Sequence, residues 1–150
     1  MRLTSWISVA GLVLALVVHG TTIWNADDAA GLMWPLNFGC IAAVLEARRK
    51  VAPNEPFRFY RHLPFWAVAT LYATTAYMIW TFFVCDRLTG GGATVVIENG
   101  QFILQVHGRV LKQLTEAEYH LHRTYQLRMF SSGWITFYLM GVLTSFFWKE

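Results

Sequence analysis

The sequence predicts an all-α membrane protein with four transmembrane helices, and with a small extramembrane β-hairpin plus amphipathic helix between the third and the fourth. Three observations support this fold class. Of the 150 residues, 55% are hydrophobic and 14% are charged, whereas charged residues make up about a quarter of a typical soluble domain. The apolar residues gather in four long blocks. The seven tryptophans lie at or near the ends of these blocks, as interfacial aromatic belts require.

The chain divides accordingly into three parts. Residues 1–89 form a three-helix membrane part, residues 90–130 an extracytoplasmic hairpin-helix cap, and residues 131–150 the fourth transmembrane helix. The composition excludes a disordered chain, a collagen, a disulfide-stapled secreted module and a typical nucleic-acid-binding domain. Because Cys40 and Cys85 lie in different apolar blocks, we expect two free, buried thiols rather than a disulfide.

The first apolar block runs from about Leu3 to Trp24. From Trp6 to Trp24 a helix rises roughly 27 Å, which is close to the thickness of the hydrocarbon core of a bilayer. A secretory signal peptide is the alternative. However, the polar run 19–22 follows Val18, where a cleavage site of small residues would stand. We therefore expect this helix to be retained.

The second block, from about Ala29 to Leu45, contains Pro35 and Asn37. Proline inside a membrane helix removes a backbone donor and usually kinks the helix, so an interruption is predicted at Pro35. Lipid offers Asn37 no hydrogen-bond partner, so this side chain is predicted to point at protein.

The third block runs from about Leu63 to Cys85 and the fourth from about Gly133 to Trp148. Small residues four apart let neighbouring helix backbones approach closely, and they occur at Ala69 and Ala73, at Thr70 and Thr74, and at Gly141 and Ser145. The polar groups Asn37, Thr70 and Thr74 are therefore assigned to packing between helices. The alternative is that they line a small polar path or a quinone pocket.

The orientation follows from the loops between the blocks. The loop from Glu46 to Arg61 carries the basic residues Arg48, Arg49, Lys50, Arg58 and Arg61, whereas residues 25–28 carry none. Since short basic loops stay on the cytoplasmic side, both termini are predicted to be cytoplasmic. The expected location is an integral, multipass position in a membrane, with a bacterial inner membrane as the host.

Within the cap, Asn99-Gly100 separates Thr94–Glu98 from Gln101–Val106. Asn-Gly between two such runs predicts a β-hairpin with a type I′ turn. In that register Val95 opposes Leu104 and Ile97 opposes Phe102, so one face of the hairpin is apolar.

After the hairpin, Thr115 and Glu118 form a capping box that predicts a helix running to Phe130 and on toward the fourth block. Ala117, Leu121, Tyr125 and Met129 recur every four residues and predict the stripe that packs against the hairpin. The alternative is that this stripe lies flat on the bilayer.

Four histidines are the candidate ligands: His107, His120 and His122 in the cap, and His19 toward the outer end of the first helix. Imidazole binds zinc, copper and haem. On a helix, however, His120 and His122 point roughly 200° apart, and their neighbours Glu116 and Glu118 form ordinary i, i+4 pairs with them. No cofactor and no metal site is therefore predicted, and ligation of zinc, copper or haem remains the alternative.

No dinucleotide, phosphate-loop, metalloprotease or nucleophile-elbow motif occurs in the sequence. Ser131 and Ser132 lie about 14 Å of helix rise from His120 and His122, which separates any nucleophile from its base. We therefore expect binding rather than catalysis: an accessory, assembly or interaction subunit of a membrane complex. Its partners would be the bilayer and another protein or a second copy of the chain, with no nucleic acid. The alternative function is a metal- or haem-binding sensor or membrane enzyme that uses the outer histidines.

Overall fold

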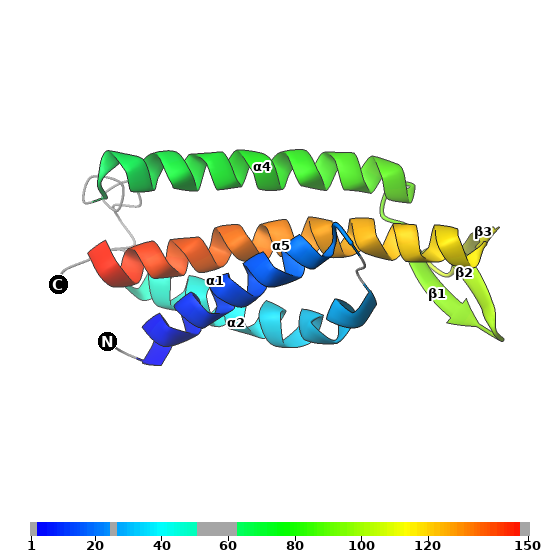
Figure 1. Ribbon diagram of the computed structural model, residues 1–150, viewed down its shortest axis with the longest axis horizontal. Helices are drawn as coiled ribbons and strands as arrows, with labels where there is room; N and C mark the ends of the chain where they lie inside the picture. Colours follow the sequence, from blue (N-terminus) through cyan, green and yellow to red (C-terminus); the bar gives the residue numbers. More distant parts are fainter. Residues whose placement is uncertain (1–2, 25–26, 51–62, 148–150) are drawn as a thin grey trace.

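The computed structural model describes residues 3–24, 27–50 and 63–147. It is mostly helical, with one small antiparallel sheet (Figure 1). The elements are α1 (Leu3–Thr21), η1 (Asp27–Leu32), α2 (Met33–Lys50), α4 (Phe65–Thr89), β1 (Thr94–Glu98), β2 (Gln101–Val106), β3 (Arg109–Leu114) and α5 (Glu116–Phe147). The predicted basic loop from Glu46 to Arg61 begins later than expected, because α2 continues to Lys50. Its remainder and the predicted ends at Arg2, Trp148 and Lys149 lie outside the described residues.

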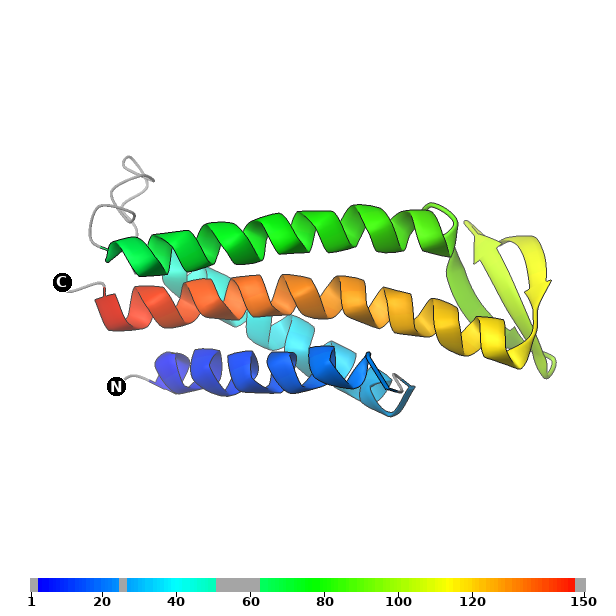
Figure 2. The ribbon, with the colours of Figure 1, turned by 45° about the horizontal axis from the view of Figure 1, so that its top comes forward.

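Helix α5 is the centre of the molecule. Helices α1 and α2 pack on one side of it and α4 packs on the other, so α4 meets the rest of the bundle mainly through α5 (Figures 1 and 2). The sheet lies at the start of α5, and α1 begins at the opposite end of the molecule, where α5 ends (Figure 2). The two cysteines, Cys40 on α2 and Cys85 on α4, are free and buried, which confirms the prediction.

Two of the described helices, α4 and α5, are long and apolar enough to cross a membrane. The apolar parts of α1 and α2 are shorter, Ser5–Thr21 and Met33–Leu45. Two helices thus support an association with a membrane, and the four crossings remain a prediction. With 32 residues, α5 is about 48 Å long, compared with about 30 Å of hydrocarbon core. This helix is therefore long enough to hold the sheet well beyond a bilayer.

The start of α2 differs from the sequence prediction. A 3₁₀ turn, η1, covers Asp27–Leu32, and α2 begins at Met33. Pro35 therefore stands in the first turn of α2, where backbone N–H groups have no partner within the helix, and its missing donor leaves no hydrogen bond unmade. The predicted interruption at Pro35 is wrong for this reason. Helix α1 ends at Thr21, before the predicted boundary at Trp24.

The predicted hairpin is confirmed. Strands β1 and β2 pair antiparallel, with Val95 opposite Leu104 and Ile97 opposite Phe102. The φ angles of Asn99 and Gly100 are 51° and 77°, so both are positive as a type I′ turn requires.

The third strand, β3, is not predicted from the sequence. It pairs antiparallel with β2 after a turn at His107-Gly108, whose φ angles of 49° and 79° repeat those of the Asn-Gly turn. Histidine adopts this left-handed conformation more readily than most residues. His-Gly is nevertheless a weaker turn signal in a sequence than Asn-Gly. The sheet therefore has three strands in the order β1-β2-β3 rather than the predicted two.

Helix α5 joins two elements that the sequence predicts separately. The cap helix and the fourth apolar block form one continuous helix from Glu116 to Phe147, and the Ser131-Ser132-Gly133 run does not interrupt it. The capping box is confirmed, because the Thr115 N–H donates to Glu118 Oε2 at 2.9 Å and the Glu118 N–H donates to Thr115 Oγ1 at 3.3 Å.

The predicted packing face of the cap helix is wrong. Leu121 is 51% exposed, whereas Tyr119 is 5% exposed and packs in a cluster with Leu104 and Leu114. The ring of Tyr119 lies 4.7 Å from that of Phe102, and the Arg123 guanidinium donates to its hydroxyl at 2.7 Å. Because that partner satisfies the hydroxyl, the large ring of Tyr119 can be buried against the sheet.

Acid is expected to loosen the start of α5. The hydrogen bond from Lys112, together with that from the Thr115 backbone, lowers the pKa of Glu118 to about 2 from an ordinary value of 4.5. A carboxyl with a lowered folded-state pKa stabilises the fold above its ordinary pKa, and this stabilisation is lost as the pH falls from 4.5 toward 2. Amide exchange of residues 112–120 measured across that window checks the prediction.

Two variants serve as controls for the acid effect. In Glu118→Gln the added acid sensitivity between pH 4.5 and 2 should disappear, whereas it should remain in Glu116→Gln. A wild-type exchange profile that stays flat in this window would contradict the role given to Glu118. Glu118 also bonds Lys112 at 2.6 Å, in place of the i, i+4 pair with His122 that the sequence predicts.

Tyr138 is the central contact between α5, α1 and α2. Its side chain is 2% exposed and lies against Gly11 and Gly39, and its hydroxyl donates to the Leu36 carbonyl at 2.9 Å. One turn later, Gly141 lies close to Ser8 of α1 and to Ala43 of α2. Small residues thus allow three helices to approach closely, which is the role predicted for Gly141.

Candidate functional site

The outer histidines are distributed over the cap. His107 occupies the turn between β2 and β3, and His120 and His122 lie on α5. His120 Nε2 lies 3.7 Å from Glu116 Oε1, which is the surface pair expected from the sequence. Among the described residues, His122 Nδ1 is buried with no hydrogen-bond partner. No group of three or more His, Cys, Asp or Glu side chains in this part of the chain could hold a metal ion, so the structure does not bring the candidate ligands together.

His19 instead links α1 to α4 and α5. Its Nδ1 lies 2.7 Å from Ser131 Oγ on α5, and its Nε2 lies 2.7 Å from Tyr77 Oη on α4. The Ser131 hydroxyl donates to the Arg128 carbonyl at 3.2 Å. With the Ser131 proton on that carbonyl, His19 Nδ1–H donates to Ser131 and Nε2 accepts from Tyr77; in the other tautomer Ser131 donates to Nδ1, and Nε2–H donates to Tyr77. The pair of Ser131 with a histidine therefore exists, but with His19 rather than with His120 or His122.

This arrangement does not support nucleophilic catalysis by Ser131. Its side chain is 0% exposed. A nucleophile must reach its substrate. The contacts of His19 and Ser131 therefore hold helices together.

Arg128 closes the end of α1 at the same level of the bundle. Its Nη2 donates to the Thr22 carbonyl at 3.1 Å, and its Nε donates to Thr22 Oγ1 at 3.3 Å. The last carbonyl groups of a helix have no partner within the helix and carry partial negative charge, so a guanidinium satisfies and stabilises them. Arg128 thus fixes the end of α1 against α5.

Of the three polar residues predicted to pack between helices, one bonds another helix through its side chain. Asn37 Oδ1 accepts a hydrogen bond from Trp134 Nε1 at 2.7 Å, which supplies the protein partner that the sequence requires. Thr70 and Thr74 donate to carbonyl groups of their own helix, at 2.8 and 3.0 Å. These hydroxyl groups reach a carbonyl one turn earlier without any neighbour. The Thr74 carbonyl accepts from Thr136 Oγ1 on α5 at 3.2 Å, and packing of the two threonines between helices stays a prediction.

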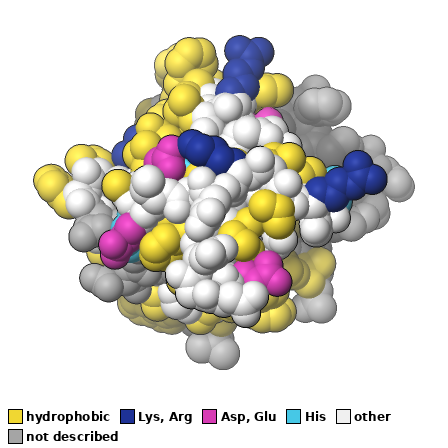
Figure 3. All heavy atoms as spheres, turned by 90° about the vertical axis from the view of Figure 1, so that its right-hand side faces the viewer, with side chains coloured by type: hydrophobic (Ala, Val, Ile, Leu, Met, Phe, Trp, Pro, Cys, Tyr) yellow, Lys and Arg dark blue, Asp and Glu magenta, His cyan; other side chains and the backbone are white. Residues whose placement is uncertain are grey.

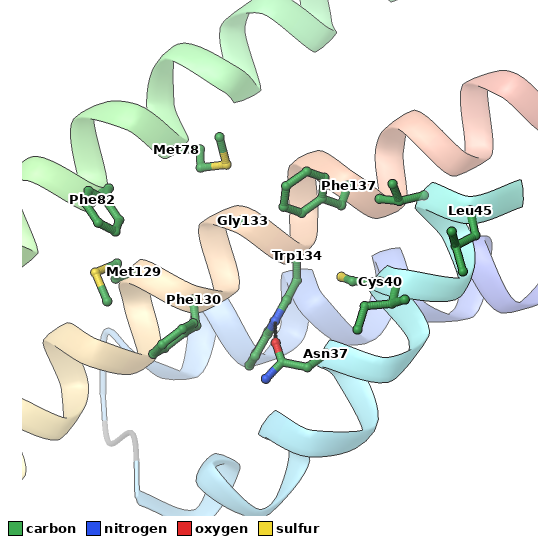
Figure 4. Close-up of a pocket in the computed structure, with 12 residues that line it drawn as sticks. Asn37, Cys40, Leu45, Met78, Phe82, Met129, Phe130, Gly133, Trp134 and Phe137 are labelled. Atoms are coloured by element: carbon green, nitrogen blue, oxygen red, sulfur yellow. Dashed lines mark hydrogen bonds between the residues drawn. The ribbon is translucent and has the colours of Figure 1, made fainter. Parts of the chain in front are cut away.

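An apolar groove with a volume of about 540 Å³ lies between α2, α4 and α5 (Figure 4). Helix α2 contributes five lining residues between Asn37 and Leu45, α4 contributes Met78 and Phe82, and α5 contributes five between Met129 and Phe137. The size and the apolar lining are those of a site for a small molecule. The sequence places Asn37 in a site of this kind only as an alternative, and it does not indicate the residues of α5.

Helix α4 exposes a regular seam on its outer face. Six exposed residues recur at alternating spacings of four and three; we call them the α4 seam: Ala69, Ala73, Ala76, Trp80, Phe83 and Arg87. This average period of 3.5 residues is the one by which two helices pack along each other. The last four of these residues also line a shallow hollow of about 520 Å³. Ala69 and Ala73 are exposed, so the close approach of a neighbouring helix that they predict is not one within the described bundle.

The end of the molecule that carries the sheet has mixed character. Basic and acidic side chains are interspersed there among apolar ones, and no large patch of one charge gathers on the face shown in Figure 3. This face therefore lacks the large basic patch that attracts nucleic acid.

Comparison with family models, with curated proteins and with solved structures gives no match for this chain. Function is therefore inferred from the groove, the α4 seam and the contacts of the histidines.

Proposed function

We propose that this chain is a small multipass membrane protein that acts as an interaction subunit of a membrane complex. It docks a transmembrane helix of a partner chain, either another protein or a second copy, along the α4 seam. The observation that carries this proposal is the seam itself, six exposed residues with the period of helix packing on a helix whose main neighbour is α5 alone. Helix pairs in membranes associate through small residues such as the three alanines of the seam.

Two further features support a docked helix. Trp80 and Phe83 stand beyond the alanines and border the shallow hollow, so a partner side chain can fill it. Arg87 follows at the end of the seam that lies toward the sheet, where a polar headgroup or an acidic partner residue can reach it. The proposed topology has four crossings, both termini in the cytoplasm and the cap outside. It is supported by α1 beginning and α5 ending at the same end of the molecule.

Ala73→Trp is expected to lower the yield of the complex by about 10-fold or more, because an indole at the closest approach of two helices separates their backbones. The measurement is co-purification from native membranes after mild solubilisation. Ala42→Trp is the matched control, since Ala42 is an exposed alanine on α2 outside the seam. A wild-type chain that purifies as a clean monomer, or a complex that tolerates Ala73→Trp, would remove the basis of the proposal.

The alternative of a histidine-centred sensor or enzyme has no supporting cluster among the described residues. We therefore propose no second function.

A further inference from the structure

We propose that the groove between α2, α4 and α5 binds an uncharged membrane lipid with a carbonyl-bearing ring and an apolar tail, a ligand of the prenylquinone class. This site is separate from the α4 seam, because α4 contributes Met78 and Phe82 to the groove and neither residue belongs to the seam. Binding in the groove therefore does not depend on the proposed partner.

The wall formed by α2 suits an apolar tail. The lining residues of this helix stand at positions 37, 40, 41, 44 and 45, which is the spacing of one continuous helix face. From Asn37 to Leu45 this face extends over about 12 Å. None of the residues that line the groove is charged or is a histidine. A fatty acid or a phospholipid headgroup would bring a charge with no partner into this wall, so the ligand is uncharged.

Asn37 supplies the polar recognition. The indole of Trp134 can only donate, so the 2.7 Å bond between Trp134 Nε1 and Asn37 Oδ1 fixes which way the amide is turned (Figure 4). Asn37 Nδ2 then presents two N–H donors, and the hydrogen bond that the described Asn37 side chain makes, through Oδ1, leaves both of them unused. The hydrocarbon of a bilayer offers none either. A carbonyl oxygen on the ligand would satisfy this amide.

The side chains around Asn37 favour a ring over the ester group of a glyceride. Four aromatic side chains line the groove: Phe82, Phe130, Trp134 and Phe137. Two methionines, Met78 and Met129, complete this region, and thioethers pack well against aromatic rings. Aromatic side chains prefer to stack with or stand edge-on to another flat ring. A quinone ring carries both the flat face and the carbonyl acceptors that these residues require.

The test uses the full chain in phosphatidylcholine nanodiscs and tritiated decylubiquinone as the probe. We expect saturable binding of about one molecule per chain, above the partition into empty nanodiscs. The critical comparison is between Trp134→Phe and the double variant Asn37→Leu with Trp134→Phe. In the double variant neither partner of the original hydrogen bond is left unpaired, so folding is preserved while the donor to the ligand is lost. Its affinity is expected to be about 10-fold lower than that of Trp134→Phe alone.

A second pair of variants tests the volume of the groove. A Cβ added at Gly133 would meet only Met78 Sδ, at 3.9 Å, so Gly133→Ala should fold and bind. Gly133→Leu should fold as well and lose the binding, because its side chain fills the groove. Unsaturable uptake equal to that of empty nanodiscs would overturn the site. Equal affinity of decylbenzene, which has the tail and a ring but no carbonyl, would overturn the assignment of the headgroup.

Discussion

Gly39→Ala and Gly11→Ala are each expected to destabilise the bundle by about 3 kcal/mol, although each adds one methyl group. A Cβ at position 11 would overlap ring carbons of Tyr138, and a Cβ at position 39 would overlap its hydroxyl. The ring cannot move aside, because it is 2% exposed and its hydroxyl is bonded to the Leu36 carbonyl at 2.9 Å. Unfolding in mixed micelles with increasing denaturing detergent measures the loss.

The same two contacts allow a stringent control. Gly20→Ala makes the identical change on α1 where a Cβ would meet nothing within 4 Å, so it should be neutral or stabilise by up to about 1 kcal/mol. Tyr138→Phe should recover much of the loss caused by Gly39→Ala, because the closest atom there is the hydroxyl oxygen. It should not recover Gly11→Ala, where the overlap is with ring carbons. Recovery of both variants, or of neither, would contradict this packing of Tyr138.

The parts of the fold that can be predicted from the sequence have both partners close together in the chain. The Asn99-Gly100 turn sets the register of β1 and β2, and Thr115 and Glu118 cap each other across three residues. These are local interactions, so a short stretch of sequence contains the whole signal. For Asn37 the sequence indicates that a partner is required, but not that it is Trp134, 97 residues away.

Contacts between distant helices could not be predicted in the same way. The bonds of His19 to Tyr77 and Ser131 join residues 58 and 112 positions apart, and they depend on the order in which four helices pack. An apolar helix in lipid has no single hydrophobic face to show that order. The spacing of the α4 seam can be read from the sequence. Whether the seam faces outward cannot, because the packing of α4 on α5 decides which face of α4 is exposed.

The groove illustrates the same limit for the candidate site. Its α2 wall has a helical period that the sequence contains, from Asn37 to Leu45. The α4 and α5 walls come from other helices. The sequence gives the order of these helices along the chain but not which of their faces meet α2. The site therefore becomes recognisable when Met78 and Trp134 are placed across from Asn37, as Figure 4 shows.

Tyr119→Ala is expected to release the sheet from α5 at a cost of about 3–5 kcal/mol, while the helices below remain folded. Tyr119 packs with Leu104 and Leu114, and its ring lies 4.7 Å from that of Phe102. A small sheet with one apolar face is unstable in water without something to cover that face. Hydrogen exchange should therefore accelerate across residues 94–114 and remain slow in α4, because local unfolding is confined to the unit that has lost its support.

Leu121→Ala tests which face of α5 packs against the sheet, the face that carries Tyr119 or the stripe that carries Leu121. Leu121 belongs to the stripe that the sequence predicts for packing, yet it is 51% exposed, so its truncation should change stability by no more than about 0.5 kcal/mol. Tyr119→Phe keeps the ring and loses the hydrogen bond from Arg123, so it should cost about 1 kcal/mol. If Leu121→Ala exposes residues 94–114 as strongly as Tyr119→Ala does, the sheet lies against the predicted stripe. The docking through Tyr119 would then be incorrect.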